Sequence, residues 1–179
     1  MTELEMKKYS RNALLGSFVS MLTAGLATMM YSVSISTIRT DLALTAVQAG
    51  SLGTYTFMGQ MLGGMVAGYL ADRYGRKNIL IVDVILATLA VFATSLLQSY
   101  SIFGILRFIT GVGLGGCYYI ASILIGEFVP TNKRGFMSGV ATSVWNFGYV
   151  VCCAMSAFAL PSIGWRWCFR ICALPIVFV

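Results

Sequence analysis

Two charged side chains, Asp83 and Arg107, lie inside long apolar stretches of the sequence. A charge in such a position is costly in lipid and normally faces protein or water. Arg107 can therefore bind an anionic solute, modulate a proton site or donate to neighbouring carbonyls, and the sequence leaves these roles open. At about 100° per residue, Gly111, Leu114 and Tyr118 share its helix face. Arg107 is our first candidate for solute contact.

Asp83 is the acid most enclosed by apolar residues, in the run Ile81–Val84. Desolvation of a carboxylate favours its protonated form, so Asp83 is a candidate for proton coupling. The same side chain can instead reach a membrane interface or pair with a nearby cation.

Uncharged polar side chains in apolar stretches supply further candidates for solute binding: Gln60, Tyr118, Tyr119, Asn146 and Tyr149. Hydrogen bonding between helices is an equally good explanation for each of them. Around Gln60, three glycines favour tight packing, namely Gly59, Gly63 and Gly64.

Catalytic and metal-binding patterns are missing from the sequence. There is no histidine, and the five cysteines lie in apolar runs without metal-ligand spacing. No nucleophile–base pair or phosphate-binding loop is present. We therefore expect neither an enzyme nor a metal ion or other cofactor.

Composition indicates which elements must position these residues. Of 179 residues, 58% are hydrophobic and only 10% are charged, whereas a soluble domain carries about 25% charged residues. The outer surface must therefore face lipid. A helix needs roughly 20 apolar residues to cross a bilayer, and six stretches qualify or nearly qualify, near residues 12–38, 47–70, 79–97, 102–126, 135–160 and 165–179.

Basic residues lie mostly on one side of these spans. Eight lysines and arginines precede the first span or follow the second and fourth, and two, Arg39 and Arg166, fall in connectors on the other side. This bias predicts a cytoplasmic amino terminus in the plasma membrane. We expect residues 1–11 to form a cytoplasmic segment and residues 12–179 a transmembrane domain. The bias also accounts for the net charge of +6 without a nucleic-acid partner.

A ten-residue motif connects the second and third spans. Residues 68–77 read GYLADRYGRK, which resembles the G-x-L-A-D-R-x-G-R-K signature of the major facilitator superfamily. Gly75 permits a tight turn there. Asp72 can accept hydrogen bonds from a helix amino terminus, and Arg76 can pair with Asp72 or with another acid.

Three further stretches are similar to segments of the same superfamily. Residues 107–116 resemble its R-x-x-x-G-x-G-x-G segment, residues 127–135 resemble the E-x-x-P-x-x-x-R-G loop of sugar and organic-acid carriers, and residues 164–175 resemble the entry to the sixth helix. The resemblance implies an all-α membrane fold, in which six helices arranged as 3+3 inverted repeats form one half of a twelve-helix carrier. It implies membrane lipid, a small organic solute and the carboxy-terminal six-helix half as partners.

The resemblance also implies a conformational latch against that second half, formed by Gly68, Asp72, Arg73, Gly75 and Arg76. Glu127 and Arg134 lie at the same level, and we expect them to form a charge cluster with Asp72 and Arg76. Four separately solvated charges are the alternative.

The function that follows is secondary transport of an organic acid or a sugar by alternating access, with or without a coupled proton. Related carriers of aromatic acids and metabolites often have an aspartate in the first span, and this chain has no acid between Leu14 and Thr40. The sequence therefore leaves open whether transport is coupled to a proton. A non-transporting half-carrier subunit or sensor is the alternative function. The last apolar run is short, so we expect the natural chain to continue beyond Val179.

Overall fold

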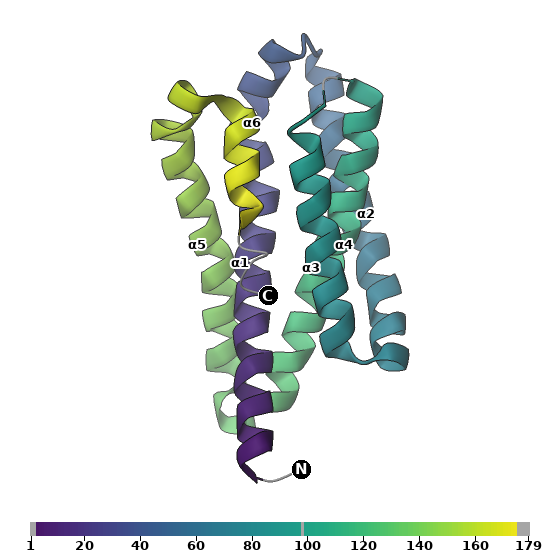
Figure 1. Ribbon diagram of the computed structural model, residues 1–179, viewed down its shortest axis with the longest axis vertical. Coiled ribbons are helices and arrows are strands. Elements are labelled where there is room, and N and C mark those ends of the chain that lie inside the picture. Colours follow the sequence, from purple (N-terminus) through teal and green to yellow (C-terminus); the bar gives the residue numbers. More distant parts are fainter. Residues whose placement is uncertain (1–2, 98, 175–179) are drawn as a thin grey trace.

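The computed structural model describes residues 3–97 and 99–174, with side chains from residue 14 onward, and this part of the chain is almost entirely helical. The helices form an elongated up-and-down bundle (Figure 1). In chain order they are α1 (Glu3–Asp41), α2 (Ala46–Tyr74), α3 (Arg76–Thr94), α4 (Tyr100–Phe128), the 3₁₀ turn η1 (Thr131–Lys133), α5 (Arg134–Phe158) and α6 (Leu160–Cys172). The expected all-α class is confirmed.

Four segments of the described chain are long and apolar enough to cross a membrane: Leu14–Asp41, Arg76–Thr94, Tyr100–Phe128 and Thr131–Phe158. Helix α2 is as long as α4, at 29 residues, but it carries more threonine and glutamine. Helix α6 has 13 residues, fewer than the roughly 20 that span a bilayer. Residues 175–179, after which we expect the natural chain to continue, lie outside the described residues.

Several helix boundaries differ from those expected. Helix α1 begins at Glu3, so residues 3–11 are helical and continuous with the first span, which begins at Leu14. The connector expected at residues 72–77 shrinks to Gly75, because α2 runs to Tyr74 and α3 starts at Arg76. Gly75 has φ +88°, a conformation that side chains disfavour. The tight turn expected at Gly75 is confirmed.

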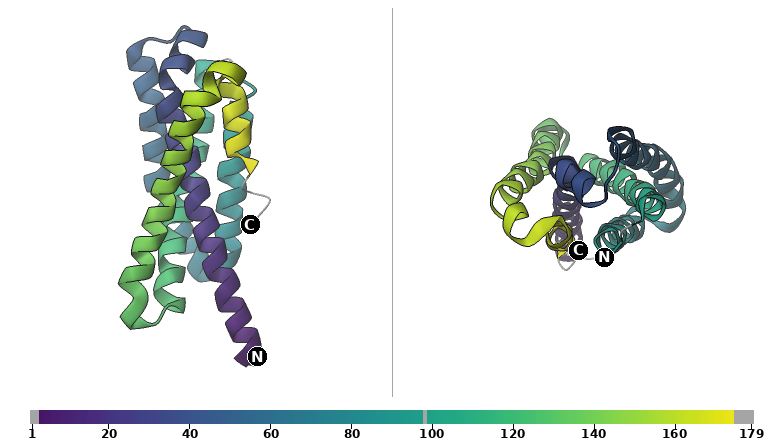
Figure 2. Two further views of the ribbon diagram at one scale, coloured as in Figure 1. Left: turned by 90° about the vertical axis from the view of Figure 1, so that its left-hand side faces the viewer. Right: turned by 90° about the horizontal axis from the view of Figure 1, so that it is seen from above.

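The ends of the helices agree with the alternation inferred from the sequence. The α2–α3 and α4–α5 turns lie toward the same end of the bundle as the amino terminus, and the other three connections lie at the opposite end (Figure 1). Viewed from above, α1, α5 and α6 form one group and α2, α3 and α4 another (Figure 2). Helices α1 and α4 contact each other between the two groups.

The most extensive helix contact is that between α2 and α4. Gly59 and Gly63 of α2 meet Gly111 and Gly115 of α4 there. A Cβ atom at any of these positions would collide with a backbone carbonyl oxygen of the opposite helix, those of Phe108, Val112, Thr56 and Gln60 respectively. Small residues let helix backbones approach closely in lipid, where packing drives association. The tight packing expected around Gln60 is confirmed for Gly59 and Gly63, whereas Gly64 makes only an ordinary contact.

The tryptophans after the fifth helix lie in different surroundings. Trp167 is 55% exposed, whereas Trp165 is 3% exposed. Trp165 packs edge-on against Phe169, with ring centroids 5.7 Å apart, and its Nε1 donates to the Asp41 carboxylate at 3.0 Å. Arg166 pairs with the same carboxylate at 2.8 Å. These bonds join the end of α1 to α6.

The glycine contact predicts a sharp difference between two adjacent residues. We expect Gly63→Ala to destabilise the protein by about 1–3 kcal/mol, the usual range for overpacking. Its new methyl group would collide with the Val112 carbonyl, whereas the methyl of Gly64→Ala would meet the Gly115 carbonyl oxygen at an ordinary 3.7 Å. Thermal unfolding of the full-length protein in detergent measures both, and equal melting temperatures would contradict the packing assigned to Gly63.

Candidate functional site

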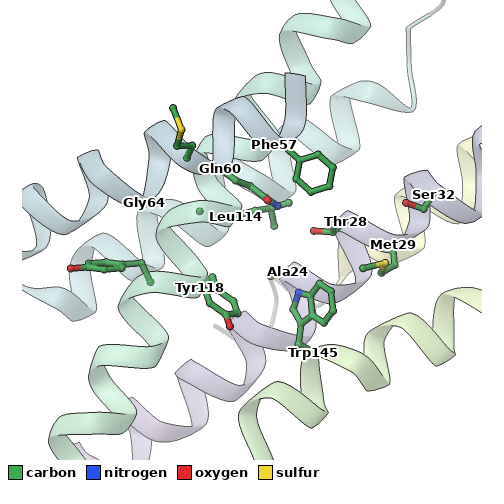
Figure 3. Close-up of a pocket in the computed structure, with 13 residues that line it drawn as sticks. Ala24, Thr28, Met29, Ser32, Phe57, Gln60, Gly64, Leu114, Tyr118 and Trp145 are labelled. Atoms are coloured by element: carbon green, nitrogen blue, oxygen red, sulfur yellow. The ribbon is translucent and has the colours of Figure 1, made fainter. Parts of the chain in front are cut away.

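A cavity of about 570 Å³ lies between α1, α2, α4 and α5. Its wall is mostly apolar and aromatic, and its polar lining groups are few (Figure 3). The side chains that face it include Thr28, Ser32, Phe57, Gln60, Leu114, Tyr118, Tyr119 and Trp145. Such a wall suits a solute with an apolar body and one or two polar groups. We call this space the central cavity.

The structure brings three of the expected solute-contact residues to the central cavity, namely Gln60, Tyr118 and Tyr119. Asn146 and Tyr149 do not line it. The Asn146 amide donates to the Thr142 carbonyl at 2.9 Å, and from α5 it is Trp145 that reaches the cavity. Sequence spacing alone could not fix how α5 is rotated about its axis.

Sequence reasoning missed the contribution of α1. Thr28 and Ser32 line the central cavity, and their four-residue spacing places them on one helix face. That spacing of two polar residues within an apolar helix is the sequence signal that indicates them.

Arg107 lies beside the central cavity and is fully buried. It lines a smaller space of about 170 Å³, which we call the side chamber, together with Thr28, Ser32, Phe57 and Thr56. Thr28, Ser32 and Phe57 line both spaces. Leu114 faces the central cavity, as does Tyr118, so the helix face predicted from Arg107 is that of the cavity.

Asp83 lies elsewhere. Asp83 is 7% exposed, and its Oδ2 has no hydrogen-bond partner among the described residues. It packs against Gly116 of α4, where a Cβ atom would collide with it. Nine residues separate Gly116 from Arg107, which places them on opposite faces of the helix. The structure therefore separates the proton-coupling candidate from both spaces.

Three charges meet at the end of the bundle that carries the α2–α3 turn. Arg76 contacts the Glu127 carboxylate directly and lies 3.7 Å from the Asp72 carboxylate. These two contacts are as expected from the motif. Asp72 does not cap α3, because the cap residue is Gly75 and no side-chain capping bond forms.

The fourth expected member of this cluster points elsewhere. Within the part of the chain that the structure describes, the Arg134 side chain donates to the Val129 carbonyl at 3.0 Å rather than to an acid. Arg73 stacks over the ring of Tyr74, with 5.6 Å between the guanidinium carbon and the ring centroid. Gly68 leaves room for Tyr119, since a Cβ atom there would lie 2.9 Å from its ring.

The surface of α3 contrasts with the cavity wall. Its exposed side chains are apolar and spaced at helical intervals, namely Val82, Ile85, Leu89 and Phe92. An apolar stripe of this kind faces lipid.

This contrast predicts different accessibility for two positions. We expect Gln60→Cys to react with a water-soluble maleimide in open membranes, because the central cavity has room for water and for the reagent. Leu89→Cys, although 59% exposed in the bundle, should react much more slowly because it faces lipid. Both changes belong in a Cys153→Ala background, since Cys153 is exposed and the other four cysteines are buried. Equal labelling rates would contradict the assignment of the cavity.

Comparison with known proteins agrees with this architecture. The model of the Major Facilitator Superfamily matches residues 17–179. The cis,cis-muconate transport protein of Acinetobacter baylyi is 33% identical over 92% of this chain and 40% of its own length. The niacin transporter NiaP of the same species is 34% identical over 81% of this chain and 33% of its own.

Among solved structures, the proton:xylose symporter XylE bound to 6-bromo-6-deoxy-D-glucose superposes with a TM-score of 0.81 at 22% identity. The match covers 96% of this chain and 43% of that one. The chain thus spans less than half the length of these transporters, which form a family of membrane transport proteins and not of enzymes. It belongs to the Major Facilitator Superfamily and has the fold of one six-helix half.

Proposed function

We propose that this chain is the amino-terminal half of a secondary carrier that moves a small organic solute across the membrane by alternating access. The observation that carries the proposal is the depth of the central cavity. Gln60 and Leu114 are the middle residues of α2 and α4, and Trp145 lies one residue from the middle of α5. Secondary transporters bind solute near the bilayer midplane, between two halves that rock about the site.

An organic acid suits this cavity better than a sugar. Relatives named for a solute are named for muconate, niacin and niacin/nicotinamide. Muconate and niacin are small unsaturated carboxylic acids, and nicotinamide is the neutral amide of niacin. The wall offers aromatic surface from Phe57, Tyr118 and Trp145, and most of its exposed surface is apolar, which suits the many hydroxyls of a sugar less well. The structural match to a xylose symporter supports the fold alone.

Proton coupling through Asp83 stays a prediction. Helix α1 has no acid between Leu14 and Thr40, so it offers no carboxylate to the cavity. Asp83 is buried between α3 and α4 without a hydrogen-bond partner among the described side chains. Its protonation would act on the packing of these helices rather than on the solute.

We place the carrier in the plasma membrane with its amino terminus in the cytoplasm. Support comes from the α2–α3 and α4–α5 turns, which lie toward the same end as the amino terminus (Figure 1). Arg76 and Lys77 lie just after the first turn, and Lys133 and Arg134 lie in the second. Basic connectors on one side mark the cytoplasmic face.

In this orientation the Gly68–Arg76 motif serves as a cytoplasmic latch toward the second half. The Asp72 side chain is 76% exposed, although it lies near Arg76, whereas the Glu127 side chain is 49% exposed and contacts Arg76 directly. Glu127 therefore holds Arg76 within this half. Asp72 is left with a free face for a group outside it.

The latch predicts a shift in conformational balance. Asp72→Asn should favour the inward-open state, because it removes a carboxylate that holds the cytoplasmic ends of the two halves together. Cysteine accessibility from the cytoplasmic side of the full-length protein measures the shift. Asp41→Asn is a matched control at the opposite end, where Asp41 bonds Trp165 and Arg166 within this half. An unchanged balance in Asp72→Asn would contradict the latch.

Uptake into proteoliposomes tests the proposed function directly. The purified full-length protein should exchange a radiolabelled organic acid such as nicotinate or cis,cis-muconate, and Gln60→Ala should lower the rate. A folded protein that takes up no acid and no sugar would instead support the alternative, a half-carrier that acts as a membrane subunit or sensor.

A further inference from the structure

Arg107 is surrounded by aromatic rings instead of counter-ions. Its guanidinium carbon lies 4.8 Å from the ring centroid of Tyr31, 5.1 Å from that of Phe169 and 5.8 Å from that of Phe103. Ring faces attract a cation, but they do not replace acceptors for the five N–H donors of a guanidinium. None of its three nitrogens has a hydrogen-bond partner among the described residues.

None of the acidic residues of this chain is placed to act as a counter-ion for Arg107. Asp41 pairs with Arg166, while Asp72 and Glu127 lie beside Arg76. Asp83 lies across α4, against Gly116. The sequence holds six acids, and the remaining two are at the start of α1, about seven helical turns from Tyr31.

A buried cation without a counter-charge is strongly unfavourable. A negative group supplied from outside this half would relieve that cost.

The side chamber gives such a group access to Arg107. At about 170 Å³ it has room for a carboxylate. Thr28 and Ser32 line it and also line the central cavity of about 570 Å³. Their hydroxyls can donate to the same carboxylate that meets the guanidinium. The two oxygens of a carboxylate accept two parallel hydrogen bonds from a guanidinium, whereas a neutral amide offers only one acceptor oxygen.

We infer that the side chamber binds the carboxylate of the transported solute, with Arg107 as its anchor and the hydroxyls of Thr28 and Ser32 as further donors. The central cavity then holds the apolar body of the solute between Phe57, Tyr118 and Trp145. The inference rests on the proposed function and narrows it. The carrier selects monoanionic or dianionic organic acids with a flat apolar body over their neutral analogues.

Acids and their amides test the site, because the two differ only in the group that would enter the chamber. The probes are nicotinate with nicotinamide, and cis,cis-muconate with its diamide. Binding is measured by thermal stabilisation of the full-length protein in detergent, and transport by uptake into proteoliposomes. The variants are Arg107→Gln, Arg107→Lys and, as a control, Arg39→Gln, which changes an exposed arginine at the end of α1.

We expect the wild type to prefer at least one acid over its amide. Arg107→Gln should weaken binding of that acid by about tenfold to a hundredfold, the range for a charged hydrogen bond, with the amide unchanged. Amide binding and a monodisperse elution profile show that this variant is folded. The affinity of Arg107→Lys for the acid should lie between those of the wild type and Arg107→Gln, because lysine keeps the charge but cannot form the two parallel hydrogen bonds. Arg39→Gln should match the wild type.

Three results would contradict the proposed site. The first is that Arg107→Gln binds the acid as well as the wild type does, and the second is that the wild type binds neither acid. The third is that Arg107→Gln loses binding of the acid and of the amide equally. The last result would mean that Arg107 pairs with a carboxylate elsewhere in the protein. Arg107-dependent binding without uptake would keep the site and reject the carrier. Uptake that does not depend on Arg107 would keep the carrier and reject the site.

Discussion

The contact between the backbones of α2 and α4 sets the geometry of the rest of the bundle. Gly59 and Gly63 meet Gly111 and Gly115 without side chains between them. In lipid no hydrophobic effect holds helices together, so close packing of small residues must do so. This contact also fixes how both helices are rotated. Gln60 consequently lies next to Gly115, and both line the central cavity.

Helix α4 separates two kinds of surroundings because its faces carry different residues. One face presents Arg107, Leu114 and Tyr118 to the side chamber and the central cavity. The opposite face presents Gly113 and Gly116 to α3, where Asp83 is buried. A charge on α3 therefore communicates with the cavity only through the packing of α4. In the carrier that we propose, protonation of Asp83 would therefore act on the solute through helix packing and not by direct contact.

Three arginines show three ways of stabilising a cation in this bundle. Arg166 pairs with Asp41 at the end of the bundle where α1 ends, and Arg76 meets two acids at the opposite end. Arg107, buried inside the bundle, has aromatic rings and no acid as neighbours among the described residues. The pairs at the ends stabilise the half itself. Arg107 is the arginine for which we infer a carboxylate partner from the transported solute.

The sequence by itself determined the class of the fold, the positions of the six helices and the turn at Gly75, because these depend on local hydrophobicity and on one positive φ angle. It also indicated Arg107, since a charge in an apolar helix is visible without a structure. Only the tertiary structure decided that Gln60 and Trp145 face the cavity while Asn146 does not. It also decided that Arg134 is not part of the charge cluster and that Asp83 and Arg107 lie apart. These facts depend on how each helix is rotated against its neighbours, and side chains distant in sequence fix that rotation.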